Sequence, residues 1–101
     1  MRRGDFILHG PRVSEPVPLA LARYAYPAAA RGSGRRANVR VGVLVDEEGK
    51  VMEAVLRERD ASDLGFNEAA LEAARKTRFQ PATRDDIPGK MWTELIFEFA
   101  E

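Results

Sequence analysis

The chain has 101 residues, of which 45% are hydrophobic and 32% are charged, and its formal net charge is zero. This balance is typical of one folded domain with a modest core, and it excludes a disordered chain. The sequence has no cysteine, which excludes a disulfide framework and a thiolate site.

The charges are unevenly distributed along the chain. Residues 1–40 contain eight arginines and two acidic residues, a balance of +6, and residues 41–101 contain eight basic and fourteen acidic residues, a balance of −6. The arginines are scattered and are not interleaved with aromatic residues, so we interpret them as solvated surface. We expect no nucleic-acid partner, and a nucleic-acid binder with a basic arm is the least favoured alternative.

The sequence predicts neither a membrane span nor a secretion signal. No stretch approaches the roughly 20 apolar residues that cross a bilayer. The first residues are basic, but the apolar run that follows, Phe6–Leu8, is shorter than the roughly 7–15 residues of a signal peptide. We therefore expect no export signal in this chain, and a native location across a membrane would require a longer parent.

The first third of the chain predicts an extended lead-in and then a short helix. Residues 1–25 contain three prolines and little periodicity, so we expect an extended, partly flexible lead-in over residues 1–15 and the domain itself over residues 16–101. Tyr26-Pro27 precedes a run of alanines, which predicts a first helix of about two turns. Gly32 and Gly34 would end it.

The middle of the chain predicts a β-hairpin. Valines alternate along residues 38–45, a pattern typical of a strand with one buried face. The acidic turn 46–50, with Gly49 near its end, leads to a return strand over residues 51–57.

The last third predicts a second helix and a third strand. Residues 66–77 place alanines and Phe66 on one side of an amphipathic helix. Pro81 lies beyond its end, and residues 83–89 are expected to form a charged loop. Residues 90–100 then alternate. One face carries Met91, Thr93, Leu95, Phe97 and Phe99, and the other carries Trp92, Glu94, Ile96 and Glu98.

These elements predict an α+β fold in which two helices pack on one face of a three-stranded antiparallel sheet. The order is helix, hairpin, helix, strand, and the helical crossover returns the last strand beside the first, giving the strand order 2-1-3. The last strand then lies at an edge with unpaired backbone groups. Leu44, Trp92 and Ile96 either form an apolar patch on the open sheet face or are covered by residues 6–25. Both alternatives stay open.

The residues offer little for catalysis or metal binding. The three serines lie in loops outside any nucleophile motif, and the single histidine, His9, has no catalytic partner group near it in the sequence. The acidic clusters lack the spacing of a calcium loop. We predict no enzyme activity, no catalytic residue, no metal and no cofactor.

Four segments together resemble one known family. They are Tyr26-Pro27 with its alanine-rich helix, VRVGVLVDEEGKV at 39–51, FNEAALEAAR at 66–75 and RFQPA at 78–82. Their order and spacing resemble the C-terminal domain of TonB, the energy transducer, from about residue 16 to the end. Ala37 stands where the family usually has glycine, and Thr77 where it often has an aromatic residue.

The resemblance implies a function in protein binding. TonB proteins are anchored in the inner membrane of Gram-negative bacteria, and their periplasmic C-terminal domain binds the TonB box, a short segment of an outer-membrane transporter. The segment adds as a strand to the last strand of the domain. Motor proteins of the inner membrane act through an anchor region that this sequence lacks. The partner-binding residues implied here are Tyr26, Pro27, Met91, Trp92, Thr93, Glu94, Leu95, Ile96, Phe97 and Glu98.

A second interpretation keeps the fold and changes the partner. The chain would then be a stand-alone or fused protein-interaction module, and its last strand could pair with that of a second copy to form a symmetric homodimer.

Overall fold

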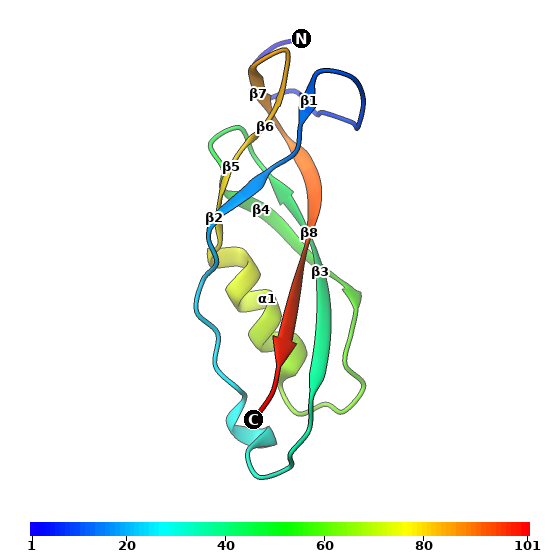
Figure 1. The fold of residues 1–101 in the computed structure, drawn as a ribbon, viewed down its shortest axis with the longest axis vertical. Helices are drawn as coiled ribbons and strands as arrows, with labels where there is room; N and C mark the ends of the chain where they lie inside the picture. Colours follow the sequence, from blue (N-terminus) through cyan, green and yellow to red (C-terminus); the bar gives the residue numbers. More distant parts are fainter.

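A computed structural model describes all residues of the chain, 1–101. The molecule is elongated, with extents of 51 × 19 × 17 Å. Its centre is a three-stranded antiparallel sheet in the order β4-β3-β8 (Figure 1). β3 (Ala37–Val45) and β4 (Val51–Glu58) form the hairpin, and β8 (Met91–Phe99) returns along the other side of β3. The predicted strand order is therefore confirmed.

One helix covers one face of this sheet. α1 (Phe66–Lys76) begins after Gly65, whose positive φ of 96° ends the preceding loop, and it ends where Thr77 becomes extended. The Thr77 hydroxyl donates a hydrogen bond of 2.9 Å to the carbonyl oxygen of Ala73. Alanines on the buried side of α1 have no bulk beyond Cβ, so the helix packs closely on all three strands.

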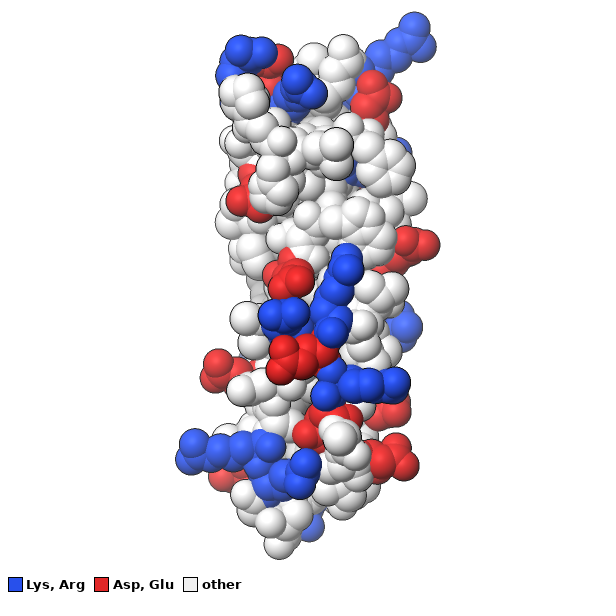
Figure 2. Space-filling model, turned by 90° about the vertical axis from the view of Figure 1, so that its right-hand side faces the viewer, with Lys and Arg blue, Asp and Glu red and all other residues white.

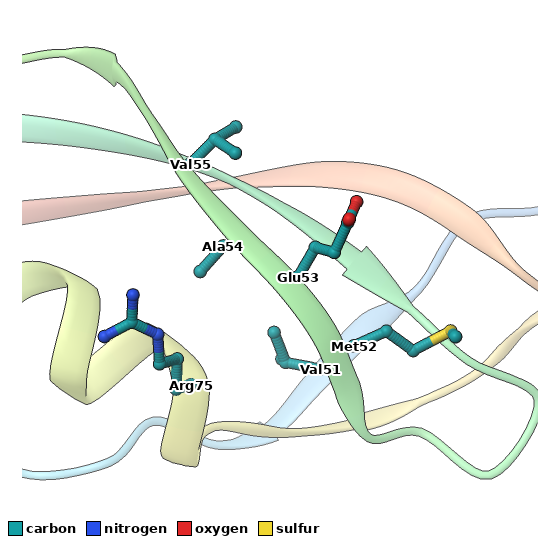
Figure 3. Close-up of a pocket in the computed structure, with 6 residues that line it drawn as sticks. All are labelled: Val51, Met52, Glu53, Ala54, Val55 and Arg75. Carbon is teal, nitrogen blue, oxygen red and sulfur yellow. The ribbon is translucent and has the colours of Figure 1, made fainter.

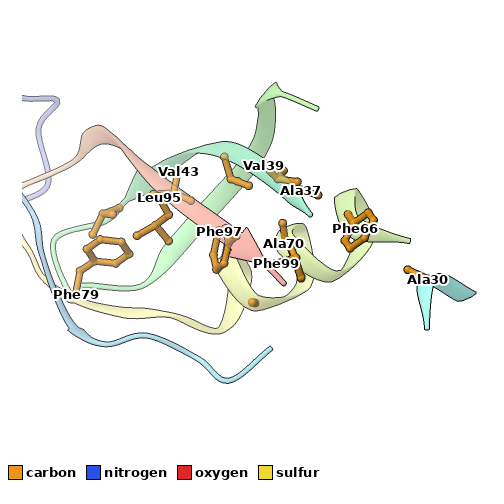
Figure 4. Packing of buried hydrophobic residues seen from close by; sticks show 14 residues of the cluster. Ala30, Ala37, Val39, Val43, Phe66, Ala70, Phe79, Leu95, Phe97 and Phe99 are labelled. Carbon is orange, nitrogen blue, oxygen red and sulfur yellow. The ribbon is translucent and has the colours of Figure 1, made fainter. Parts of the chain in front are cut away.

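The core lies between α1 and the sheet (Figure 4). Ala22, Tyr24 and Tyr26 pack against it. The ring of Tyr24 packs edge-to-face on Phe97 and Phe99, with centroids 5.1 Å apart in each pair. The segment that carries Tyr24 therefore lies on the helix side of the sheet. The buried cluster comprises Ala30, Ala37, Val39, Val41, Val43, Val45, Phe66, Ala70, Ala73, Ala74, Phe79, Leu95, Phe97 and Phe99.

The prediction of two helices was wrong. The alanine run forms only a three-residue 3-10 helix, η1 (Ala28–Ala30). Its hydrogen bonds join residues three apart, from Ala30 N–H to Pro27 O (3.0 Å) and from Arg31 N–H to Ala28 O (3.2 Å). Arg31 is already extended, and glycines with positive φ follow it, so the run is too short to repay the cost of nucleating an α-helix.

The structure also contains short strands that the sequence did not predict. β1 (Val13–Ser14), β6 (Ala82–Arg84) and β7 (Ile87–Gly89) form a second sheet in the order β1-β6-β7. β2 (Val17–Ala20) pairs with β5 (Arg78–Gln80). The expected loop 83–89 is thus a hairpin. Its two turn residues, Asp85 and Asp86, both have positive φ, as a tight two-residue hairpin turn requires.

The N-terminal residues extend the sheet beside the start of β8. Gly4 N–H donates to Pro88 O (2.9 Å), Ile7 N–H to Lys90 O (2.7 Å), and Lys90 N–H to Asp5 O (2.8 Å). Phe6 and Lys90 form an isolated parallel bridge. Residues 4–7 therefore lie along the edge of the sheet just before β8 begins.

Two hydrogen bonds between the Asp60 backbone and the Asn67 side chain fix the loop before α1. Asp60 N–H donates to Asn67 Oδ1 and Asn67 Nδ2 donates to Asp60 O, both at 2.8 Å. The carboxylate of Asp60 accepts from the Ser62 hydroxyl and the Ser62 N–H, and Arg35 lies 3.7 Å away. These contacts lower the pKa of Asp60 below its ordinary value, and the hydrogen bond from the Ser62 hydroxyl has the largest effect.

The lowered pKa predicts a pH-dependent contribution to stability. Because the folded pKa of Asp60 lies below the unfolded one, its carboxylate stabilises the fold above the unfolded pKa, and this contribution is lost as the pH falls through the folded value. Asp60→Asn should lower the free energy of unfolding by about 1 kcal/mol near neutral pH. Urea titrations of both proteins across the acidic range should show the gap closing, and an equal gap at every pH would contradict the assignment.

Candidate functional site

One edge of β8 pairs with β3, and the other is an outer edge of the sheet. β8 pairs with β3 over nine residues, from Val45 opposite Met91 to Ala37 opposite Phe99, without a register shift. In a regular antiparallel strand the N–H and C=O of one residue point to the same edge, and successive residues alternate. Lys90 binds Asp5 and Ile7, away from β3. The even-numbered residues of β8 therefore direct their backbone groups outward.

Three of these outward residues have no backbone partner. At one end of the strand Lys90 is occupied by residues 5 and 7, and at the other end Glu98 O accepts a hydrogen bond of 3.2 Å from the Tyr24 hydroxyl. Between them, Trp92, Glu94 and Ile96 present three N–H donors and three C=O acceptors to solvent. We call this stretch, residues 92–96, the free edge. It can pair with about five residues of an added strand.

The same three residues also expose their side chains. Trp92 is 36% and Ile96 58% exposed, and Glu94 is exposed as well. They lie on the sheet face opposite α1. Residues 6–9 lie beside Trp92 on this face and leave it open toward Ile96. The other predicted residues of β8 have different places: Met91, Leu95 and Phe97 are buried, Thr93 is half-buried, and Glu98 is exposed beyond the free edge.

The three apolar side chains that the sequence places on this sheet face differ in exposure. Leu44, which pairs with Trp92, is only 5% exposed. Residues 6–9 lie beside Trp92, whereas Ile96 stays uncovered. Of the three apolar side chains, Leu44 is therefore buried, and Trp92 and Ile96 stay exposed on this face.

A glycine lets an arginine reach Trp92 across the sheet. The Arg57 guanidinium carbon lies 5.5 Å from the centre of the Trp92 ring, although the two residues belong to strands on opposite sides of β3. A Cβ atom at Gly42, in the strand between them, would overlap Arg57 Nε. Gly42 thus leaves space for a cation–π contact that orients the Trp92 ring. The sequence did not single out either residue, because their contact depends on strand register.

Two charged side chains, Arg40 and Glu58, lie near Glu94 of the free edge. Arg40 lies 3.8 Å from Glu94 and 3.6 Å from Glu58, and all three side chains are about half exposed. Exposed pairs of this kind contribute little to stability, so they are available to respond to a partner. Figure 2 shows basic and acidic side chains interspersed across the middle and lower part of one side of the molecule. A largely uncharged stretch lies above them, and further charged side chains lie at the upper end.

The opposite edge of the sheet is less suited to strand pairing. β4 has two register shifts against β3, one between Arg40 and Val41 and one between Leu44 and Val45. Such irregularities twist an edge and interrupt the alternation that an added strand needs. Figure 3 shows α1 contributing Arg75 to a hollow of about 420 Å³ beside this strand, lined also by Val51, Met52, Glu53, Ala54 and Val55.

Tyr26 and Pro27 lie near the end of β8, beyond the free edge. The Tyr26 hydroxyl donates to Arg35 O (2.6 Å), and its ring packs edge-to-face on Phe66 at 5.4 Å. Pro27 contacts Gly65 at the start of α1, where an added Cβ would lie 3.2 Å from it. Both residues are therefore engaged within the domain, and their part in partner binding stays a prediction.

The remaining surface offers no grouping of metal ligands: no three His, Asp or Glu side chains come together in a way that could hold an ion. None of the helices has the length and apolar character needed to cross a membrane.

The family of the chain follows from its sequence. Residues 22–100 match the model of the family described as Gram-negative bacterial TonB protein C-terminal. The chain belongs to this family. The family assignment made from the motifs is thereby confirmed, and members of the family are periplasmic protein-interaction modules in energy transduction.

A solved TonB structure has a similar fold. The solution structure of the Pseudomonas aeruginosa TonB C-terminal domain aligns with a TM-score of 0.62 and 23% identity, over 93% of this chain and 91% of that one. At this identity the likeness establishes the α+β fold and no more. Comparison with curated protein sequences gave no significant match. Residues 1–21 lie outside the family match, although β1, β2 and the segment beside Lys90 belong to the fold.

Proposed function

We propose that this TonB C-terminal domain binds an extended segment, the TonB box, of an outer-membrane transporter by adding it as a strand to the free edge of β8. The observation that carries the proposal is the row of unpaired outward backbone groups at Trp92, Glu94 and Ile96 on a regular strand. Family membership supports the class of partner. The domain would act in the periplasm as part of a chain anchored in the inner membrane, where motor proteins would act on the anchor.

Strand addition suits a domain that transmits force. Up to six backbone hydrogen bonds can form along the free edge, each with a net value of about 1 kcal/mol. Ordering the segment offsets much of this gain, so the complex is expected to be of modest affinity. Backbone bonds hold any extended segment, and the exposed side chains of the free edge then select among segments.

The charge at the centre of the free edge favours a different chain as partner over a second copy. Two free edges paired about a two-fold axis would be centred on Glu94 and would place the two Glu94 side chains opposite each other. Like charges directly opposite are destabilising in an antiparallel pair. A transporter segment with a neutral or basic residue at that position avoids this repulsion. The homodimer is the alternative outcome, and it would appear as a dimer in solution without peptide.

A pair of double variants tests the proposal. Trp92→Ala with Glu94→Arg removes the aromatic ring and reverses the charge at the free edge, and both side chains are exposed, so the fold should persist. We expect binding of a fluorescein-labelled TonB-box peptide, measured by anisotropy, to weaken about tenfold or more.

The matched control places the same kind of change on the other edge. Met52→Ala with Glu53→Arg alters two exposed residues of β4 and should leave peptide affinity unchanged. Equal affinity of all three proteins, or a loss confined to the β4 variant, would overturn the proposal.

A further inference from the structure

A preformed apolar hollow lies at the start of the free edge. It has a volume of about 170 Å³, room for one aliphatic or aromatic side chain. It is lined by Phe6, Ile7, Leu8, His9, Met91 and Trp92.

Large apolar side chains surround this hollow and remain in contact with water. Leu8 is 82% and Phe6 64% exposed, beside the partly exposed ring of Trp92. Ile7 and Met91, in contrast, are almost fully buried and form its floor. Clustered exposed apolar side chains of this kind are typical of a binding surface.

The N-terminal wall of the hollow is held in place by the fold. Besides the backbone bonds of residues 4–7, Lys90 Nζ donates to Gly4 O at 2.6 Å and lies 3.6 Å from Glu47. A Cβ atom at Gly89 would overlap Asp5 O, so the glycine allows this close approach. The hollow therefore needs little ordering when a side chain enters it.

The position of the hollow links it to the free edge. Phe6 pairs with Lys90, and partners in a bridge direct their side chains to the same sheet face, the face that Trp92 shares with Lys90. An added strand beside Trp92 would meet Phe6 and Leu8 at one of its ends. On the other side of Trp92 the surface is polar, with Arg57, Thr93 and Glu94.

We infer that this hollow receives one apolar side chain of the segment that binds the free edge. The partner segment would thus carry an aliphatic or aromatic residue at its end next to Trp92 and a polar residue two positions along, over Arg57 and Glu94. The inference rests on the proposed function and adds to it the side-chain class that the segment must contain. It also gives residues 6–8, which lie outside the family match, a part in partner selection.

A double-mutant cycle tests the inference. Two peptides copied from a TonB box, identical except for leucine or serine at the position next to Trp92, are titrated into the domain and its Leu8→Ser variant. Trp92 is the single tryptophan of the chain, so its fluorescence reports directly on the hollow. We expect the peptide change and the Leu8→Ser change each to weaken binding about tenfold, and the two losses not to add.

The matched control is Leu19→Ser in β2, which removes another exposed leucine away from the hollow and should change nothing. Leu8 is so exposed that its replacement should leave the fold intact. If both peptides bind equally well, or if the losses add in full, the inference is overturned while the proposed function stands. If neither peptide binds the unaltered domain, the proposed function fails as well.

Discussion

Glu94→Pro is expected to abolish binding of a TonB-box peptide while the domain stays folded. Glu94 lies at the centre of the free edge, and its N–H points away from β3. Proline removes this donor and places its ring where an added strand would lie. Proline is tolerated on edge strands when the missing N–H faces solvent, so we expect a loss of only about 1–3 kcal/mol in the free energy of unfolding.

Two controls separate the backbone from the side chain. Glu94→Ala keeps the N–H and removes only the carboxylate, so most of the affinity should remain. Leu95→Pro removes an N–H that is bonded to β3, within a buried part of the core, and should unfold the domain. Isothermal titration calorimetry and circular dichroism measure the two effects. Peptide binding by folded Glu94→Pro would show that the outward groups of β8 are not used.

Gly49→Ala is expected to be the most destabilising replacement of a single glycine in the chain. Gly49 has a φ of 82°, and its carbonyl accepts a hydrogen bond of 2.9 Å from Phe79 N–H. A Cβ atom there would overlap the carbonyl oxygen of Phe79, whose side chain is buried in the core. We expect the free energy of unfolding to fall by about 3–5 kcal/mol, since both backbone strain and displacement of Phe79 contribute.

Gly32→Ala is the matched control for this effect. Gly32 has nearly the same φ, 83°, but no atom lies within 4 Å of the position that its Cβ would take. This variant carries only the strain of a left-handed backbone, about 1–2 kcal/mol. Urea denaturation measures both values. Equal losses would show that the β3–β4 turn can move away from β5 without cost.

The main elements could be predicted because their signals are local. Alternating valines specify β3, the alternation from Met91 to Phe99 specifies β8, and both observed strands lie within one residue of the expected ones. The predicted helix 66–77 is likewise observed as Phe66–Lys76. In each case one buried face recurs with the period of the element over eight residues or more.

The rest of the fold depends on distant pairing. β1, β2, β5, β6 and β7 have only two to four residues each, too few for a periodic pattern. β2 forms because β5, some 60 positions away, lies beside it, for example with Val17 opposite Gln80. The prediction of a short α-helix after Pro27 was wrong for the opposite reason. Local propensity favours a helix there, but the run is too short to form one.

The candidate site was predictable as a strand but not as a free edge. Sequence alternation indicated which side chains of β8 are exposed. Which backbone groups remain unpaired depends on Asp5 and Ile7 occupying Lys90 and on Tyr24 reaching Glu98 O, and none of these contacts has a sequence signal. The contact of Arg57 with Trp92 over Gly42 has the same origin.

Amide hydrogen exchange along β8 tests the central claim most directly. In the domain alone, the amides of Trp92, Glu94 and Ile96 should exchange quickly, and those of Met91, Thr93 and Leu95, which are bonded to β3, should exchange slowly. On adding a TonB-box peptide, we predict that the first group becomes protected and the second is unchanged. Protection that appears along β4, or nowhere on β8, would contradict the account.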